Sequence, residues 1–79
     1  PSLEIFPNPS INGQFNIESS QSVMQIELYS PEGRLVEVIA PTTDIRTWSI
    51  STSDWKAGVY FVNVQYLSGS IFAHRIVVR

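Results

Sequence analysis

Apolar and polar side chains alternate with a period of two along almost the whole chain, and no stretch sustains the 3.6-residue period of an amphipathic helix. Seven short runs carry this alternation, with glycine, proline, asparagine or serine between them. The runs are Leu3–Phe6, Gln14–Glu18, Val23–Tyr29, Arg34–Ile39, Ile45–Ser51, Val59–Leu67 and Ser70–Val78. Short strands at such regular spacing are typical of a sandwich. The sequence therefore predicts an all-β fold, a seven-stranded immunoglobulin-like antiparallel β-sandwich.

The turn residues predict how the strands connect. Pro7-Asn8-Pro9 is expected to stop the first strand, because proline has no N–H to donate to a ladder. Ser30-Pro31-Glu32-Gly33 suits a type I turn followed by a glycine bulge, which predicts a hairpin between the third and fourth strands. Ser68-Gly69 predicts a tight hairpin between the last two strands, and Asn12-Gly13 predicts a sharp corner. Residues 53–58 form the one segment that suits a single helical turn, with Gly58 as its stop.

The phase of each run predicts which side chains face the core. In the third run Met24, Ile26 and Leu28 are expected to point inward. The sixth run differs, because Tyr60 and its neighbours in phase are apolar on one face while Val59 and Phe61 are apolar on the other. A strand that is apolar on both faces is either central in its sheet or has a face that meets a partner.

Composition limits what this fold can do. Seventy-nine residues make one domain at most, and a chain this short often needs a disulfide or a metal for stability. It has no cysteine and one histidine, so packed apolar and aromatic side chains must stabilise it. The net charge of −2 and the scattered basic residues argue against nucleic acid, and no apolar run is long enough to span a bilayer. The start at Pro1, without methionine or signal peptide, is interpreted as a cut: residues 1–79 are expected to be one domain excised from a larger secreted protein.

No residue pattern predicts chemistry. His74 lies inside the last run with no cysteine or second histidine to assist it, and a structural role in the strand is favoured. Glu18, Glu27 and Glu37 fall on the polar phase of their strands, where solvation accounts for them. No glycine-rich phosphate loop or calcium loop is present in the sequence. We therefore predict no enzyme activity, no catalytic residue, no cofactor, no metal and no small-molecule substrate.

The two tryptophans leave one alternative open, because sugar-binding sandwiches use aromatic platforms. Trp48 is in phase with Ile50 and is expected in the core. Trp55 lies in a polar connection, where it either caps one end of the sandwich or stands exposed. A cap is favoured over a sugar site.

Three motifs, in order, resemble the type A C-terminal sorting domain of proteins exported by the type IX secretion system of Gram-negative bacteria. The first is Ile5-Phe6-Pro7-Asn8-Pro9 with Gly13, Phe15 and Ile17. The second is Ile26-Glu27-Leu28-Tyr29 with Gly33-Arg34-Leu35-Val36. The third is residues 57–62, Ala-Gly-Val-Tyr-Phe-Val, with Arg75-Ile76-Val77-Val78-Arg79. His74 departs from the pattern, since lysine is frequent at its position. Together the motifs cover nearly the whole chain.

The resemblance implies a non-catalytic signal that directs an upstream passenger domain through the outer-membrane translocon. A shuttle and a sortase-like cysteine peptidase are the further implied partners, and the peptidase removes the domain at the cell surface. The implied location is the periplasm in transit, then the cell surface or the medium. The recognition residues carried over from the motifs are Pro7, Asn8, Pro9, Gly13, Leu28, Tyr29, Gly33, Val36, Gly58, Val59, Tyr60, Phe61, Ile76, Val77, Val78 and Arg79.

Within this set, Gly58–Phe61 and Ile76–Arg79 are expected to be read by the translocon or its shuttle, with a conventional core role as the alternative. A homodimer through the C-terminal hairpin is a further expectation, because an apolar face or edge there would need covering. The competing functions are a glycan- or protein-binding accessory module of a secreted enzyme and a structural spacer. An exposed aromatic cluster around Trp55, Tyr66 and Phe72 would favour the binding module.

Overall fold

The computed structural model describes residues 3–79, and within them it contains strands and turns but no helix, which confirms the all-β prediction. The strands are β1 (Leu3–Ile11), β2 (Gln14–Ser19), β3 (Val23–Tyr29), β4 (Leu35–Ile39), β5 (Thr47–Ser51), β6 (Gly58–Tyr66) and β7 (Ile71–Val78). Pro1 and the interpretation placed on it lie outside the described residues. No helix of the described chain is long and apolar enough to cross a membrane.

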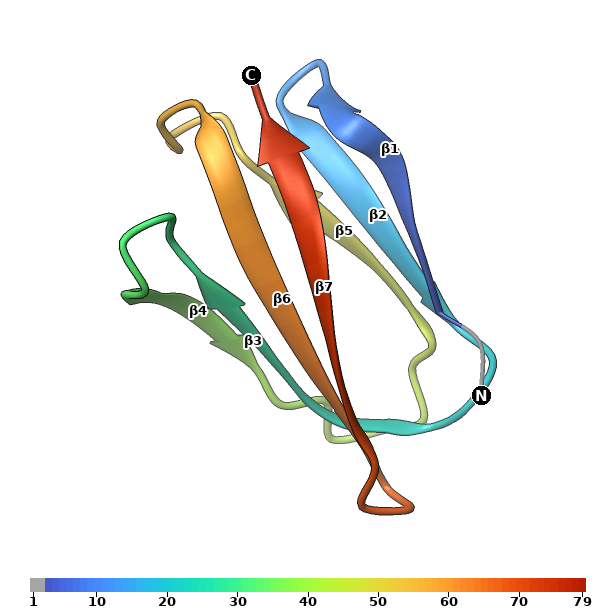
Figure 1. Cartoon of the computed structure of the whole chain (residues 1–79). Coiled ribbons are helices and arrows are strands. Elements are labelled where there is room, and N and C mark those ends of the chain that lie inside the picture. The colour runs from blue at the N-terminus through green and yellow to red at the C-terminus, as the bar shows by residue number, and fades with distance from the viewer. Residues whose placement is uncertain (1–2) are drawn as a thin grey trace.

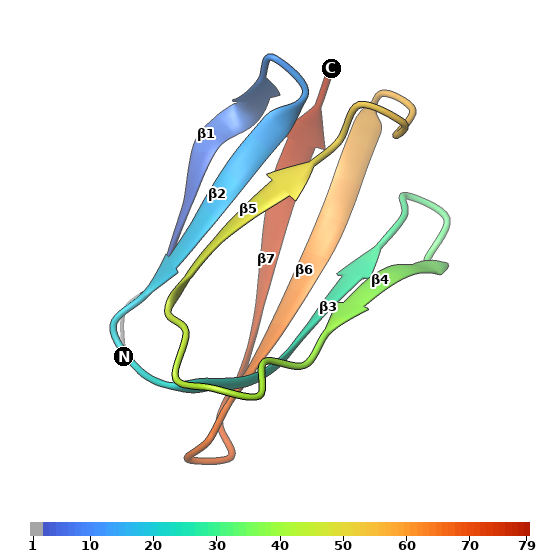
Figure 2. The same cartoon turned by 180° about the vertical axis from the view of Figure 1, so that it is seen from behind.

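The strands form two antiparallel sheets that pack face to face as an immunoglobulin-like sandwich, as the sequence predicts (Figure 1). The three-stranded sheet has the order β1-β2-β5 and lies in front when the molecule is seen from behind (Figure 2). The four-stranded sheet has the order β4-β3-β6-β7. β6 is therefore central between β3 and β7, and β4 and β7 are the two edge strands of this sheet.

The core fills the space between the sheets. It consists of the apolar side chains that the period-two alternation directs to the inner face of each strand. The buried apolar side chains are Phe15, Ile17, Val23, Ile26, Leu28, Ile50, Tyr60, Val62, Val64, Tyr66, Ile76 and Val78. Burying one large aliphatic or aromatic side chain contributes about 1.5–3 kcal/mol, and the core contains no disulfide. Trp48, expected in the core, is only half-buried and packs against this cluster from its margin.

The first strand does not end at Pro7, so the predicted stop is wrong, although its pairing with β2 is interrupted at the prolines, as their missing donors predict. β1 pairs with β2 in register from Leu3 to Phe6, loses the register across the prolines, and pairs again at Ile11. Proline removes backbone donors without changing the direction of an extended chain. The segment is therefore an edge strand that continues without a regular ladder.

The inward position predicted for Met24 is also wrong. A register shift between Val23 and Gln25, where β3 pairs with β6, places Val23 in the core and leaves Met24 41% exposed. A bulge of this kind offsets the alternation by one residue on one side of the irregularity. Ile26 and Leu28, which follow it, are buried as predicted.

Local hydrogen bonds confirm the predicted hairpin turns but not the helical turn. Ser30 and Arg34 close the β3–β4 turn with a 2.8 Å backbone bond, and the Gly33 N–H donates to the Ser30 carbonyl at 2.9 Å. The φ of Gly33 is +86°, the left-handed conformation that the glycine bulge requires. In residues 53–58 there is a tight turn in place of a helix, and the Trp55 N–H donates to the Thr52 carbonyl at 2.9 Å.

Candidate recognition surface

Parts of the three motifs, far apart in the sequence, meet at one end of the sandwich. We call this the motif end; it holds the Asn12-Gly13 corner, the β3–β4 turn, the β5–β6 connection and Arg79 (Figure 1). The opposite end, with the Ser68-Gly69 turn and the start of β1, is called the hairpin end. Cross-contacts join the parts of the motif end: the Thr52 N–H donates to the Gly13 carbonyl at 2.7 Å.

Four of the predicted recognition residues are core. Leu28, Tyr60, Ile76 and Val78 are each at most 5% exposed, so no partner can contact their side chains in the folded domain. The Tyr60 hydroxyl donates to the Lys56 carbonyl at 2.7 Å and fixes the β5–β6 connection. For these residues the core alternative holds.

Gly33 and Gly58, two of the motif glycines, are required for different structural reasons. Gly33 serves the β3–β4 turn through its positive φ. Gly58 serves a close approach, because a Cβ placed on it would lie only 2.8 Å from Cγ of Pro31. The start of β6 therefore packs directly against the tip of the β3–β4 hairpin, and a side chain at Gly58 would push the two apart.

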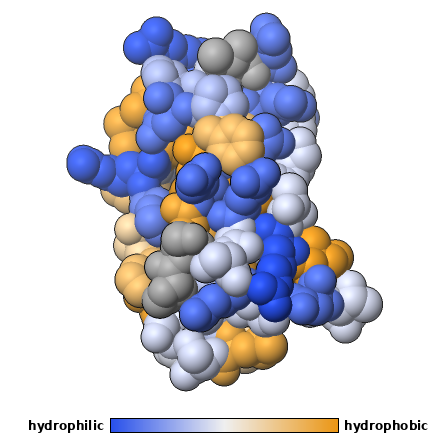
Figure 3. Space-filling view, turned by 90° about the vertical axis from the view of Figure 1, so that its right-hand side faces the viewer, coloured by the Kyte–Doolittle hydropathy of each residue, from blue (hydrophilic) through white to orange (hydrophobic). Residues whose placement is uncertain are grey.

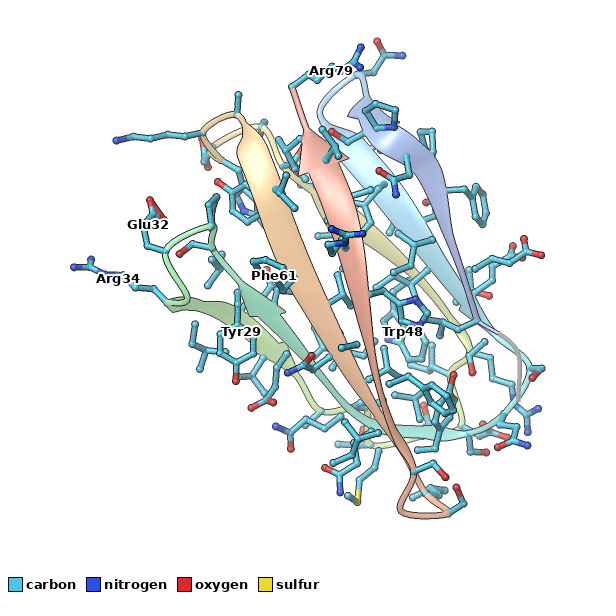
Figure 4. The ribbon with its side chains drawn as sticks, in the orientation of Figure 1. Tyr29, Glu32, Arg34, Trp48, Phe61 and Arg79 are labelled. Carbon is cyan, nitrogen blue, oxygen red and sulfur yellow. The ribbon has the colours of Figure 1, made fainter. Side chains whose placement is uncertain are left out.

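A strip of apolar side chains crosses the outer face of the four-stranded sheet near the motif end. Cross-strand register places Leu35 opposite Tyr29, and Tyr29 opposite Phe61, on one face. Val59 and Val77 form the next pair along the sheet. We call these five residues the outer strip. Phe61 is 38% exposed and Val59 is 40% exposed, and Figure 4 shows Tyr29 and Phe61 side by side on the solvent side of the sheet.

The outer strip explains why β6 is apolar on both faces. β6 is central in its sheet, and in addition its Val59–Phe61 face is uncovered. The first interpretation that the sequence left open, a central strand, is therefore confirmed, and a partner on the uncovered face stays a prediction. Partial desolvation raises the pKa of the Tyr29 phenol above its usual value, and the charge of Glu27 and a hydrogen bond to it raise this pKa further. Tyr29 thus stays neutral at physiological pH and adds no charge to the strip.

A shallow groove of about 720 Å³ lies beside the strip, between the β3–β4 turn and the β5–β6 connection. Its walls include Val36 and Gly58 from the motifs, and the ionisable side chains Glu32, Arg34 and Lys56. Figure 4 shows Glu32 and Arg34 pointing away from the sheets into solvent. The lining of the groove thus combines apolar and ionisable side chains.

Asn8 occupies a different place, at the β1–β7 side of the sandwich, between Pro7 and Pro9. Its side-chain amide donates to the Arg75 carbonyl at 3.2 Å, and the Val77 N–H donates to its Oδ1 at 3.0 Å. Arg79 follows β7 at the motif end and is exposed, with its side chain reaching beyond the sheet (Figure 4). Figure 3 shows the β1 side of the molecule, where apolar residues are interrupted by hydrophilic ones and form no broad apolar face.

Trp55 caps the motif end of the core, as the sequence favours. Its ring stacks on Tyr60, with centroids 4.6 Å apart, and meets Phe15 edge-on at 6.0 Å. Tyr66 is 1% exposed. The exposed cluster of Trp55, Tyr66 and Phe72 that a glycan-binding module would need is therefore not formed.

His74 points inward on β7 opposite Val62, and its Nε2 atom is buried without a hydrogen-bond partner in the described part of the chain. No three residues of metal-ligating type come together within residues 3–79. The structural interpretation of His74 fits this setting.

Sequence reasoning missed three residues of the surface. Leu35 joins the outer strip only because a bulge between Leu28 and Tyr29 sets its register. Pro31 matters through its contact with Gly58, and Arg75 through its carbonyl. Only Pro31 left a local signal, as a turn proline; the other two roles depend on pairing between distant strands.

The fold and surface together define a small β-sandwich with an exposed apolar strip on its four-stranded sheet. A comparison with protein families then identifies it: residues 4–79 match the secretion system C-terminal sorting domain, and the chain belongs to this family. It is thus a C-terminal sorting domain of the type IX secretion system, which implies export to the cell surface or the medium of a Gram-negative bacterium. A separate comparison with curated proteins found no match.

Proposed function

We propose that residues 1–79 form one non-catalytic domain, cut from a larger protein, that is read at its motif end during export of an upstream passenger. The observation that supports this is the convergence of three sequence-distant motifs at one end, beside an apolar strip that the fold leaves uncovered. A contiguous exposed apolar patch is typical of an interaction site.

The translocon or its shuttle contacts the outward side chains of Gly58–Phe61 and of Ile76–Arg79. Within these segments Val59, Phe61 and Val77 are available to a partner, whereas Tyr60, Ile76 and Val78 act through the core. The passenger crosses the periplasm with the domain attached. A sortase-like cysteine peptidase then cuts upstream of β1, and the passenger remains at the surface or is released.

Homodimerisation belongs to the same proposal. A second copy would cover the outer face of β6 and β7, where Phe61 and Val59 are exposed. It would not use the β7 backbone at Arg75 and Val77, because Asn8 already bonds there. Light scattering over a range of protein concentrations tests this, and a monomer at all concentrations would contradict it.

The main experiment is an export assay with matched surface variants. Residues 1–79 are fused to the C-terminus of a periplasmic fluorescent protein in a strain with an intact type IX system. Val59→Thr with Phe61→Thr removes apolar surface while keeping residues suited to a strand. We expect the exported fraction to fall roughly tenfold, the equivalent of about 1.4 kcal/mol of lost binding. Gln65→Thr, on the same face of β6 toward the hairpin end, is the control and should export normally.

Two further fusions complete the assay. Polar residues appended after Arg79 should block export without unfolding the domain, because Arg79 is exposed beyond the end of β7. Deletion of Ser70–Arg79 also removes buried Ile76 and Val78, so it tests fold and signal together. If the wild-type fusion is folded but stays in the periplasm, the proposed function is wrong.

A further inference from the structure

The side chain of Asn8 makes two hydrogen bonds to the backbone of β7, across 67 and 69 positions of sequence. It donates to the Arg75 carbonyl at 3.2 Å and accepts from the Val77 N–H at 3.0 Å. β7 is an edge strand that pairs with β6 on one side only. Because backbone groups alternate sides along a strand, Arg75 and Val77 point away from β6 and Ile76 points toward it. Asn8 therefore occupies the open edge of β7.

The two bonds have the pattern of a parallel β-bridge. In a parallel pair, one residue donates to the residue before its opposite number and accepts from the residue after it. Asn8 does this around Ile76 with its side-chain amide. The arrows of β1 and β7 run in the same direction, and the two strands are in contact (Figure 1). The amide thus takes the place of a backbone peptide group of an additional strand.

The flanking prolines explain why a side chain is needed. Pro7 and Pro9 have no N–H, and β1 has lost its regular register with β2 between Phe6 and Ile11. An asparagine side chain carries both a carbonyl acceptor and an N–H donor, so it can satisfy both β7 groups. The prolines also fix their own φ angles, which limits the freedom of the segment that carries Asn8.

We propose that Asn8 is a positioning residue, a side-chain edge cap that holds the last third of β7 in the sheet and closes this part of its edge to an added strand. The two capped groups lie on either side of Ile76, which is fully buried. Unpaired edge groups are the sites at which foreign strands add. This inference rests on the proposed function. If export partners bind Ile76–Arg79, they contact its outward side chains and do not pair with its backbone edge.

Amide hydrogen exchange of residues 1–79 tests the cap directly. Asn8→Ala should lower the protection of the Val77 amide by roughly three- to tenfold, as expected for one lost hydrogen bond. The Ile76 amide faces β6 and is the internal reference, so its protection should change less. Equal loss at both amides, or no loss at Val77, would overturn the proposal.

Asn8→Asp adds a readout that loss of packing alone would not produce. The ionised carboxylate can accept from Val77 but cannot donate to the Arg75 carbonyl. Below a pH of about 4 the carboxyl group becomes protonated and regains a donor. Val77 protection in this variant should stay above that of Asn8→Ala at neutral pH, because the carboxylate still accepts from the Val77 N–H, and should approach wild type in acid. Wild type and Asn8→Ala carry the same His74 and Arg75, so comparison at each pH removes their contribution. Val77 protection in Asn8→Asp as low as in Asn8→Ala at neutral pH would overturn the cap.

The export assay separates this inference from the proposed function. If Asn8→Ala lowers Val77 protection and lowers export, both stand. If the wild-type fusion is not exported while Val77 protection falls in Asn8→Ala, the cap stands and the proposed function fails. If Val77 protection is unchanged in Asn8→Ala while the wild-type fusion is exported, the cap is wrong and the proposed function is unaffected.

Discussion

β4 and β7 are the two edge strands of one sheet, yet their open edges are protected in different ways. β7 is held by the amide of Asn8 and buries Ile76 and Val78 beneath that contact. β4 has side chains exposed along most of its length, including Val38 at 44%, and begins at a bulge. Register puts Glu37 opposite buried Leu28, so a charge stands at the rim of the core.

The difference shows two solutions to one problem. An edge strand presents unpaired backbone groups, and proteins protect it by covering it or by adding bulges and charges. β7 is covered by a specific contact from the other sheet, whereas β4 relies on a bulge and Glu37. We therefore expect β7 to be the more rigid edge and β4 the more tolerant one.

The largest expected effect is on the free energy of unfolding when one side chain on each edge strand is shortened to alanine. Ile76→Ala should lower the free energy of unfolding by about 2–5 kcal/mol, because a fully buried side chain is lost from the core. Val38→Ala should lower it by less than about 1 kcal/mol, since Val38 is exposed. Urea titration followed by tryptophan fluorescence measures both. Similar losses at the two edges would show that the comparison is wrong.

A second prediction concerns the contact between β6 and the β3–β4 turn. Gly58→Ala places a methyl group 2.8 Å from Cγ of Pro31, and we expect a loss of about 1–3 kcal/mol from overpacking. Adding Pro31→Ala removes Cγ and should restore most of the stability. If Gly58→Ala alone is neutral, the β4 hairpin moves freely enough to absorb the contact.

The third prediction tests the protection of the β4 edge. Glu37→Val should change the stability of the monomer by no more than about 0.5 kcal/mol but should promote self-association, because the charge at the edge is removed. Glu18→Val is the matched control, since β2 lies between β1 and β5 and has no free edge. Light scattering at increasing concentration should separate the two variants. Equal association by both would point to added hydrophobicity as the cause.

The smallest expected effect lies in the connection that leaves β4. Hydrogen bonds from Arg46 and Ser22, together with the charge of Arg46, hold the pKa of Asp44 below its usual value. A lowered pKa in the folded state stabilises the fold above the unfolded pKa of about 3.9, and this stability is lost as pH falls through the folded pKa. Asp44 is exposed, so the change is small.

Asp44→Asn checks this sign. The variant should be slightly less stable than wild type near neutral pH, and the difference should shrink toward a pH of about 2. Urea midpoints at several pH values provide the measurement. A gap that stays constant with pH would mean that the charge of Asp44 contributes nothing.

Local chemistry alone determined several features. The period of two defined the strands, because alternate side chains of a strand lie on opposite faces. Ser30–Gly33 defined its turn, because proline presets φ and Gly33 accepts the left-handed conformation. Three ordered motifs were enough to indicate the family, which the match over residues 4–79 confirms.

Pairing between distant segments decided the rest. Bulges decide which face of the sheet Met24 and Leu35 lie on. These bulges depend on the partner strand and leave no local signal in the sequence. The sequence could place Asn8 between two prolines and predict an interrupted strand. Only the packing of the two sheets brought it to β7, since a side-chain amide finds its donor and acceptor 69 and 67 residues away solely in the folded chain.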